Sequence, residues 1–116
     1  MTYRVDLTER AVRNLRRIYQ NINAKDAVQA RDWFNGLEKA VFGLKEYPAR
    51  GAPIPEDGDL RHLLYGRKGH RYRIIYAIDG RNHVVTVLHI RHGSRAALMP
   101  DSPDDDRTVS WLQSNW

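Results

Sequence analysis

Residues 70–79, HRYRIIYAID, form the most regular β-strand pattern in the chain. Successive side chains of a strand point to opposite faces of its sheet. One face of this strand would carry the large apolar side chains Tyr72, Ile74, Tyr76 and Ile78. The other face would carry Arg71, Arg73, Ile75 and Ala77. We therefore expect helices to cover the apolar face and the mixed basic face to stay open to a partner.

Further strands are expected on both sides of this segment. Residues 60–65 and 83–91 also read as strands, and they are separated from it by glycine-containing turns at 66–69 and 80–82. Turns this short join antiparallel neighbours. At the start of the chain, residues 3–7 alternate apolar and charged side chains, which predicts one more short strand.

Two helices are expected between the first strand and residue 48. Thr8 offers a hydroxyl to cap the first helix, and Asp26 with Gln29 has the form of a capping box for the second. Pro48 would end the second helix. Gly36, inside the apolar pattern, predicts close packing against the first helix. Because the connection is short, the helices should form an antiparallel hairpin. Residues 49–59, with two glycines and two prolines, are expected to be a loop.

The predicted fold is α+β, in the order β-α-α-β-β-β, with a helical hairpin packed on one face of a small, mostly antiparallel sheet. The chain has 116 residues, 41% of them apolar and none of them cysteine, which indicates one domain without disulfides. We place this domain at residues 1–98. Residues 99–116 would form an acidic, tryptophan-containing tail, either a short docked helix, an extension lying on the basic sheet, or a disordered terminus.

The size and composition exclude several classes of function. A core of this size is too small to enclose a large cofactor, so none is expected. The histidines lack the carboxylate neighbours or the spacing of a metal site. No apolar run approaches the length of a membrane span, and residues 1–6 do not resemble a secretory signal. We therefore expect a cytoplasmic protein.

The net charge of +5 is concentrated in one part of the chain. Residues 60–95 contain eight Lys and Arg side chains, all five histidines and a single acidic residue, Asp79. Such a segment is typical of a surface that binds a polyanion or an acidic protein, although a solvated basic face would look the same. The candidate target- or phosphate-binding residues are Arg61, Arg67, Arg71, Arg73, Arg91 and Arg95.

Structural roles compete with binding at some of these positions. Arg73 is about as well suited to an ion pair with Asp79 or Asp6 as to phosphate binding. Arg61 would reach a helix carboxylate, Glu38 or Glu46. Gly93 would allow a backbone conformation that a side chain disfavours.

Three segments resemble the RelE/ParE superfamily of bacterial type II toxins, also described as plasmid stabilisation proteins. They are LRHL at 60–63, YRIIY at 72–76 and VLHIRHGSR at 87–95, and the resemblance covers residues 3–98. It implies a toxin that a cognate antitoxin neutralises by wrapping around it and occupying its groove and sheet. A homodimer and a heterotetramer with the antitoxin are both compatible with the resemblance.

Members of this superfamily divide by target. RelE-like members cleave messenger RNA in the ribosomal A site, whereas ParE-like members inhibit DNA gyrase and are not known as nucleases. The RelE-like pattern implies two lysines on the second strand, an arginine on the third, and a late arginine and tyrosine. Arg73 matches, but the other positions hold Tyr65, Arg67, Gly93 and Met99. The sequence therefore favours a gyrase inhibitor that is not an enzyme.

Two alternatives remain open. The chain would be a metal-independent, ribosome-dependent endoribonuclease if Arg73, His92 and Arg95 formed its catalytic set, because RNA cleavage needs proton transfer and cations around the phosphate. It would be a non-toxic binding module if only the fold and the basic sheet were retained.

Overall fold

A computed structural model describes residues 2–55, 57–67, 70–93 and 108–109 of the chain. The elements in chain order are β1 (Arg4–Thr8), α1 (Glu9–Asn21), α2 (Val28–Phe42), the 3₁₀ turns η1 (Gly43–Lys45) and η2 (Pro48–Arg50), β2 (Ala52–Ile54), β3 (Asp57–Tyr65), β4 (Tyr72–Asp79), β5 (Val84–His92) and β6 (Thr108–Val109). The α+β class and the expected order of the main elements are confirmed.

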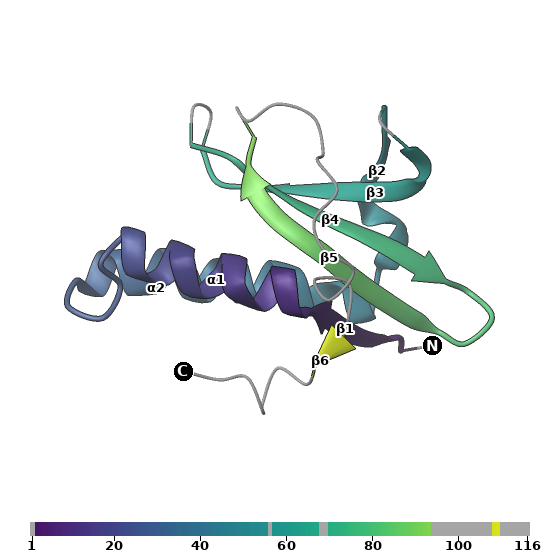
Figure 1. Cartoon of the computed structure of the whole chain (residues 1–116), viewed down its shortest axis with the longest axis horizontal. Helices are drawn as coiled ribbons and strands as arrows, with labels where there is room; N and C mark the ends of the chain where they lie inside the picture. The colour runs from purple at the N-terminus through teal and green to yellow at the C-terminus, as the bar shows by residue number, and fades with distance from the viewer. Residues whose placement is uncertain (1, 56, 68–69, 94–107, 110–116) are drawn as a thin grey trace.

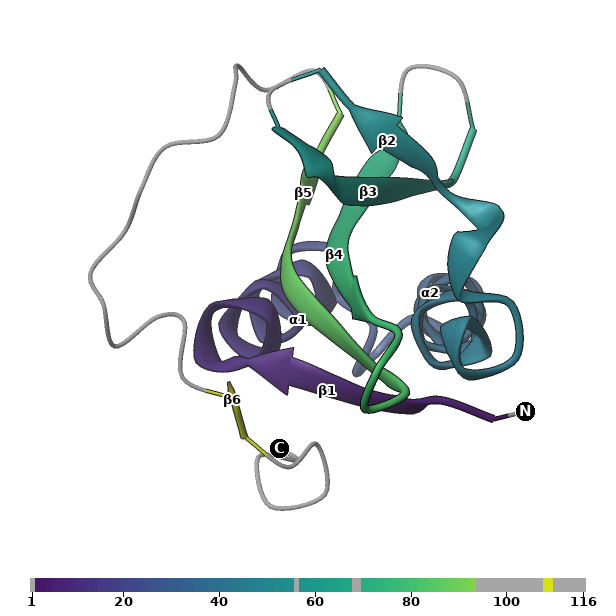
Figure 2. The same cartoon turned by 90° about the vertical axis from the view of Figure 1, so that its right-hand side faces the viewer.

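The strands form one mixed sheet in the order β2-β3-β4-β5-β1-β6. Among the described strands, only β1 and β5 pair in parallel, which the long connection through α1 and α2 allows. Figure 1 shows the two helices side by side along one face of the sheet. In Figure 2, α1 lies towards β1 and β5, and α2 lies on the other side of β4. The rings of Tyr19 on α1 and Phe34 on α2 meet at 5.0 Å.

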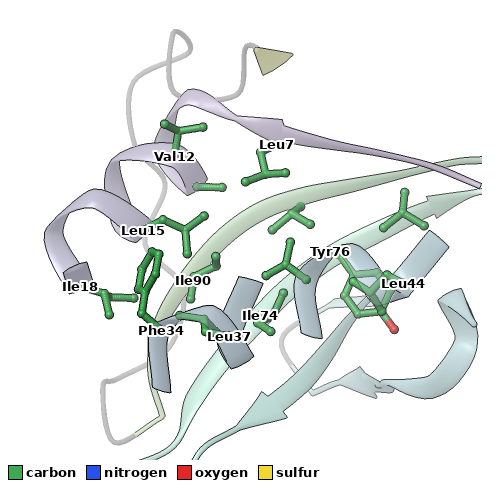
Figure 3. Packing of buried hydrophobic residues seen from close by; sticks show 14 of the residues in the cluster. Leu7, Val12, Leu15, Ile18, Phe34, Leu37, Leu44, Ile74, Tyr76 and Ile90 are labelled. Atoms are coloured by element: carbon green, nitrogen blue, oxygen red, sulfur yellow. The ribbon is translucent and has the colours of Figure 1, made fainter. Parts of the chain in front are cut away.

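The core fills the space between the helices and the sheet (Figure 3). Its fully buried side chains include Leu7, Leu15, Phe34, Leu37, Ile74, Tyr76, Val85 and Val87. As the alternation predicts, Ile74 and Tyr76 of β4 belong to this core, and Tyr72 and Ile78 pack against it. The opposite side of β4 is therefore the side turned away from the helices.

Thr8 joins three elements at the start of α1. Its hydroxyl oxygen accepts a hydrogen bond from the Ala11 amide at 3.1 Å, which confirms the predicted helix cap. The same hydroxyl donates to the Leu88 carbonyl of β5 at 2.6 Å. Further along α1, the side-chain oxygen of Asn14 accepts the Ile90 amide at 2.9 Å. These two hydrogen bonds pair the Leu88 carbonyl and the Ile90 amide of β5 at positions where β1 has ended and α1 lies beside β5.

A β-bulge in β5 changes which side chains face the helices. Ile75 of β4 pairs with His89 and Tyr76 pairs with Val87, so Leu88 is the extra residue. Before the bulge, Val85 and Val87 face the core; after it, Ile90 does. Strict alternation from Val87 would have placed His89 and Arg91 against the helices. The bulge turns both of them to the opposite face.

Several local expectations are wrong. The second helix has no capping box: its N-cap is Ala27, which makes no side-chain cap. The reason is that the turn at Asn23, with a φ of 57°, extends to Ala27, and Arg31 binds the loop carbonyls of Ala24 and Lys25. The helix also ends at Phe42, before Pro48, because its last turn tightens into η1.

The expected loop at 49–59 contains strand structure. Ala52 pairs with His62 and Pro53 pairs with Arg61, which makes β2 an edge strand, where proline is tolerated. Gly36 packs against β3 and not against α1, since an added Cβ would collide with the Tyr65 hydroxyl. That hydroxyl donates to the Trp33 carbonyl at 2.7 Å.

Part of the predicted tail forms a strand. Thr108 and Val109 pair with Thr8 and Leu7 as β6, at the free edge of β1. The boundary at residue 98 and the remainder of the tail lie outside the described residues. Among the described helices, none is long and apolar enough to cross a membrane.

Candidate functional site

The face of the sheet turned away from the helices carries a cluster of basic and imidazole side chains. We call the outer face the side of β3, β4 and β5 that holds His62, Leu64, Arg73, Ile75, His89 and Arg91. Strand register fixes this grouping, because Arg73 lies opposite both Leu64 and Arg91, and Ile75 lies opposite both His62 and His89. Ile75 is fully buried and His89 is 6% exposed, so the centre of the cluster is tightly packed.

Arg73 and Arg91 are direct cross-strand neighbours. Two arginines at such positions place two positive charges side by side, an arrangement that an anion between or near them would stabilise. In the described chain, the acidic side chains of this face, Asp6 and Asp79, lie at its other end. Asp79 is six residues along β4 from Arg73, about 20 Å at the usual rise of a strand. The Arg73 end of the outer face is therefore suited to an anionic group.

His62 binds Arg73 directly. The Arg73 Nε–H donates to the His62 Nδ1 at 3.0 Å. Arg73 does not form the expected ion pair with Asp79 or Asp6, which lie at the far end of the face: Asp6 pairs with Arg4, and Asp79 accepts from the Arg81 backbone amide and the Asn82 side chain. His62 and His89 were absent from the sequence-predicted set. Period-two alternation along β3 places His62 on one face with Leu64 but does not relate it to Arg73, which needs the β3–β4 register. The bulge hides His89 from any period-two pattern.

Among the other predicted residues that the structure describes, Arg91 lies directly opposite Arg73 and Arg61 lies on the other face of the sheet. Arg61 points to the core side, where its guanidinium donates to the Gly51 carbonyl at 2.6 Å and not to Glu38 or Glu46. Backbone carbonyls of η2 and the following residue hold it there because that turn passes beside β3. Arg67 and Arg71 are exposed near the β3–β4 turn. Arg95 lies outside the described residues.

His92 occupies the helix side of β5. Its ring meets Tyr72 edge-on at 5.3 Å, and Tyr72 in turn contacts Trp33 of α2 at 5.6 Å. His92 and Arg73 therefore lie on opposite faces of the sheet. The next residue, Gly93, does not have a left-handed φ; its amide donates to the Arg71 carbonyl at 2.7 Å, and an added Cβ would lie 3.1 Å from that oxygen. Close approach of two backbones, and not a special conformation, explains this glycine.

The far end of the outer face has a different character. A cavity of about 540 Å³ there is lined by Arg4, Asp6, Asp79, Asn82, Val84 and Thr86. Hydrogen bonds from the Asn82 side chain and from the Asn82 and Arg81 amides lower the pKa of Asp79. The described residues contain no group of three side chains suited to hold a metal ion. The outer face thus runs from a basic end at Arg73 and Arg91 to a mixed-charge end at Asp6 and Asp79.

Known proteins resemble this chain in sequence and architecture. The chain matches the family model of the ParE toxin of type II toxin–antitoxin systems, parDE, over residues 5–97. It is 34% identical over 99 residues to Toxin RelE of Mycobacterium tuberculosis (strain ATCC 25618 / H37Rv), covering 84% of this chain and 88% of that protein.

Two solved structures have the same fold. The RelBE2 toxin–antitoxin complex of M. tuberculosis has a TM-score of 0.54 at 25% identity, covering 79% of this chain and 99% of that chain. A mutant of the E. coli toxin RelE in the free state has a TM-score of 0.57 at 19% identity, covering 81% and 86%. The two-helix layer on a mixed sheet thus defines a small toxin of the RelE fold. The chain belongs to the ParE toxin family, within the RelE/ParE superfamily of type II toxins.

Proposed function

We propose that this toxin is a RelE-like, metal-independent endoribonuclease that cleaves messenger RNA at the ribosome. The observation that carries the proposal is the outer face, where two arginines lie directly opposite each other beside two histidines. Cleavage through the 2′-hydroxyl needs cations to hold the charge that builds on the phosphate and groups that move protons. Arginine and imidazole are suited to these two tasks near neutral pH.

In this proposal Arg73 and Arg91 hold the scissile phosphate. Arg73 also matches the third-strand arginine that the resemblance to RelE-like toxins implies. His92, with its ring against Tyr72, is not part of the phosphate site. The 34% identity to a protein named Toxin RelE supports this branch over gyrase inhibition.

The partner that neutralises the toxin would be a cognate antitoxin. A structure of similar fold and 25% identity is a toxin–antitoxin complex, which supports this part of the proposal. An acidic antitoxin segment would meet the basic end of the outer face, so the antitoxin and the RNA would compete for Arg73 and Arg91.

Inhibition of DNA gyrase is the second candidate, because the matching family model describes a ParE toxin. It requires a binding surface only, and the outer face could supply one. A non-toxic binding module would bind its partner through the same face and would neither cleave RNA nor inhibit gyrase.

Induced expression without antitoxin separates these candidates in one culture. We expect new messenger RNA ends within minutes, mapped by sequencing 5′ ends, with plasmid supercoiling unchanged. Arg73→Ala and Arg91→Ala should each abolish the cuts, whereas Arg81→Ala, an exposed arginine in the β4–β5 turn, should cut like the wild type. Intact messages with relaxed or cleaved DNA would establish gyrase inhibition instead. Unaffected growth with intact RNA and DNA would indicate the binding module.

A further inference from the structure

We infer that His62 is a positioning residue for Arg73: its Nδ1 holds the Arg73 Nε–H and thereby aims the two Nη groups of the guanidinium at the anion bound on the outer face. The inference rests on the proposed function only in taking that anion to be an RNA phosphate. It assigns a role to a histidine that no strand pattern singled out.

The strand register makes this contact specific. His62 on β3 pairs with Ile75, and Arg73 lies two residues before Ile75 on β4. The two side chains are therefore diagonal neighbours on one face, within reach of a long side chain. Ile75 is fully buried beside them and His89 is nearly so, which leaves the imidazole little room to turn away.

The hydrogen bond also decides how the imidazole carries its proton. Arginine remains charged in proteins and can only donate, so the His62 nitrogen that meets it must present a lone pair. With Nδ1 accepting at 3.0 Å, the ring proton sits on Nε2. In this form neither nitrogen is ready to accept a proton from a substrate: Nδ1 is engaged by Arg73, and Nε2 already carries hydrogen. His62 therefore acts through Arg73 and not as the general base.

The effect on Arg73 follows from the planarity of guanidinium. Once the Nε–H is directed at His62, the plane of the group is fixed, and a phosphate must be met by the Nη edge. Orienting the group before the anion arrives saves the entropy of ordering a long side chain. This is the reason for placing an imidazole acceptor beside an arginine that meets an anion.

Nuclear magnetic resonance of the purified toxin tests the contact without any assay of toxicity. In protein labelled with ¹⁵N, long-range proton–nitrogen correlations of the His62 ring should report the Nε2–H tautomer near neutral pH. The Arg73 Nε–H should give a signal protected from exchange with water. A ring protonated on Nδ1, or a rapidly exchanging Nε–H, would overturn the inference.

Three substitutions separate positioning from direct catalysis. His62→Asn keeps an acceptor oxygen near the place of Nδ1, whereas His62→Gln places its amide near Nε2, and His62→Leu has no acceptor. We expect Asn to retain cleavage within about threefold, and both Gln and Leu to lose about 10- to 100-fold. His62→Leu should add no further loss to Arg73→Ala. Leu and Asn variants of equal activity, or Gln as the better substitute, would refute the role.

A binding measurement distinguishes failure of the positioning role of His62 from failure of the proposed nuclease function. The probe is a short RNA whose 2′-hydroxyls are replaced by hydrogen, so that it binds without being cut. His62→Asn should bind it like the wild type, and His62→Leu about tenfold more weakly, with His70→Leu, an exposed histidine in the β3–β4 turn, unchanged. Equal binding by Asn and Leu variants refutes the positioning role. Absence of cleavage by a wild type that binds the probe refutes only the nuclease.

Discussion

The hydroxyl group of Tyr76 shows how a single buried polar atom holds a turn, here η2, in place. Its side chain is fully buried in β4, yet its hydroxyl donates to the Pro48 carbonyl at 2.6 Å and accepts from the Gly51 amide at 3.0 Å. Burial raises the pKa of Tyr76, and the Gly51 hydrogen bond with the nearby Arg61 and Arg50 opposes this. One residue therefore fastens η2 to the central strand.

Tyr76→Phe removes that hydroxyl and leaves a buried carbonyl and amide without their partner. We expect the free energy of unfolding to fall by about 1–3 kcal/mol, measured by urea denaturation. Tyr47→Phe is the matched control, because Tyr47 is 64% exposed beside the same turn and its change should stay within about 0.5 kcal/mol. Equal effects of the two substitutions would contradict this account.

Glu38 is a half-buried carboxyl whose charge works against the fold. Partial burial raises its pKa above the ordinary value of 4.5. The folded protein therefore holds its proton more tightly than the unfolded chain, and stability falls as the pH rises through the raised pKa. Glu38→Gln should unfold at a higher temperature than the wild type at neutral pH, and the difference should vanish below about pH 4. A variant less stable at neutral pH would show that the carboxylate has a favourable partner.

At the scale of elements, β5 depends on side chains of α1. Thr8 and Asn14 supply hydrogen bonds to β5 beyond the end of β1, at positions 80 and 76 residues away in the chain. These contacts lie beside the bulge at Leu88 and fix the part of β5 that carries His89 and Arg91. The first helix therefore helps to set the outer face without being part of it.

Asn14→Ala should leave the Ile90 amide without its acceptor. We expect a loss of about 1–3 kcal/mol in the free energy of unfolding and faster hydrogen exchange at Ile90 than in the wild type. Arg17→Ala, on the exposed side of the same helix, serves as the control for helix propensity. Unchanged exchange at Ile90 would mean that another group satisfies this amide.

Local patterns predicted the elements better than their ends. The helix cap at Thr8 depends on a hydrogen bond to Ala11, only three residues away, so the local sequence could predict it. The start of α2 could not be predicted in this way, because the turn at Asn23 and the side chain of Arg31 compete with any cap at Asp26. β2 was missed for a similar reason: its pairing partner is β3, and proline-rich residues form a strand only at such an edge.

At the scale of the whole molecule, the two faces of the sheet differ in character. The helix side holds the aromatic and aliphatic core, whereas Arg73 and Arg91 lie side by side on the outer face. If these two arginines hold RNA phosphates as proposed, binding releases counterions from the RNA, and its affinity should depend strongly on salt.

Wild-type affinity for the uncleavable RNA should fall linearly with salt on logarithmic axes. Arg73→Ala and Arg91→Ala should each reduce that slope by about one, measured by fluorescence anisotropy over a salt series. Arg81→Ala should leave the slope unchanged, since the β4–β5 turn is at the far end of the sheet from Arg91 (Figure 1). A reduction of equal size for Arg81 would show that the RNA is held by general charge and not by the outer face.

The amino-acid sequence by itself determined the helices, the alternation of β4 and the basic segment, because these follow from contacts within a few residues. The tertiary structure alone decided which arginines meet. The bulge at Leu88 turns Arg91 towards Arg73, the passing turn of η2 draws Arg61 to the other side, and β3 register sets His62 against Arg73. Each of these depends on hydrogen bonds between distant parts of the chain, and a shift of one residue in register moves a side chain to the opposite face.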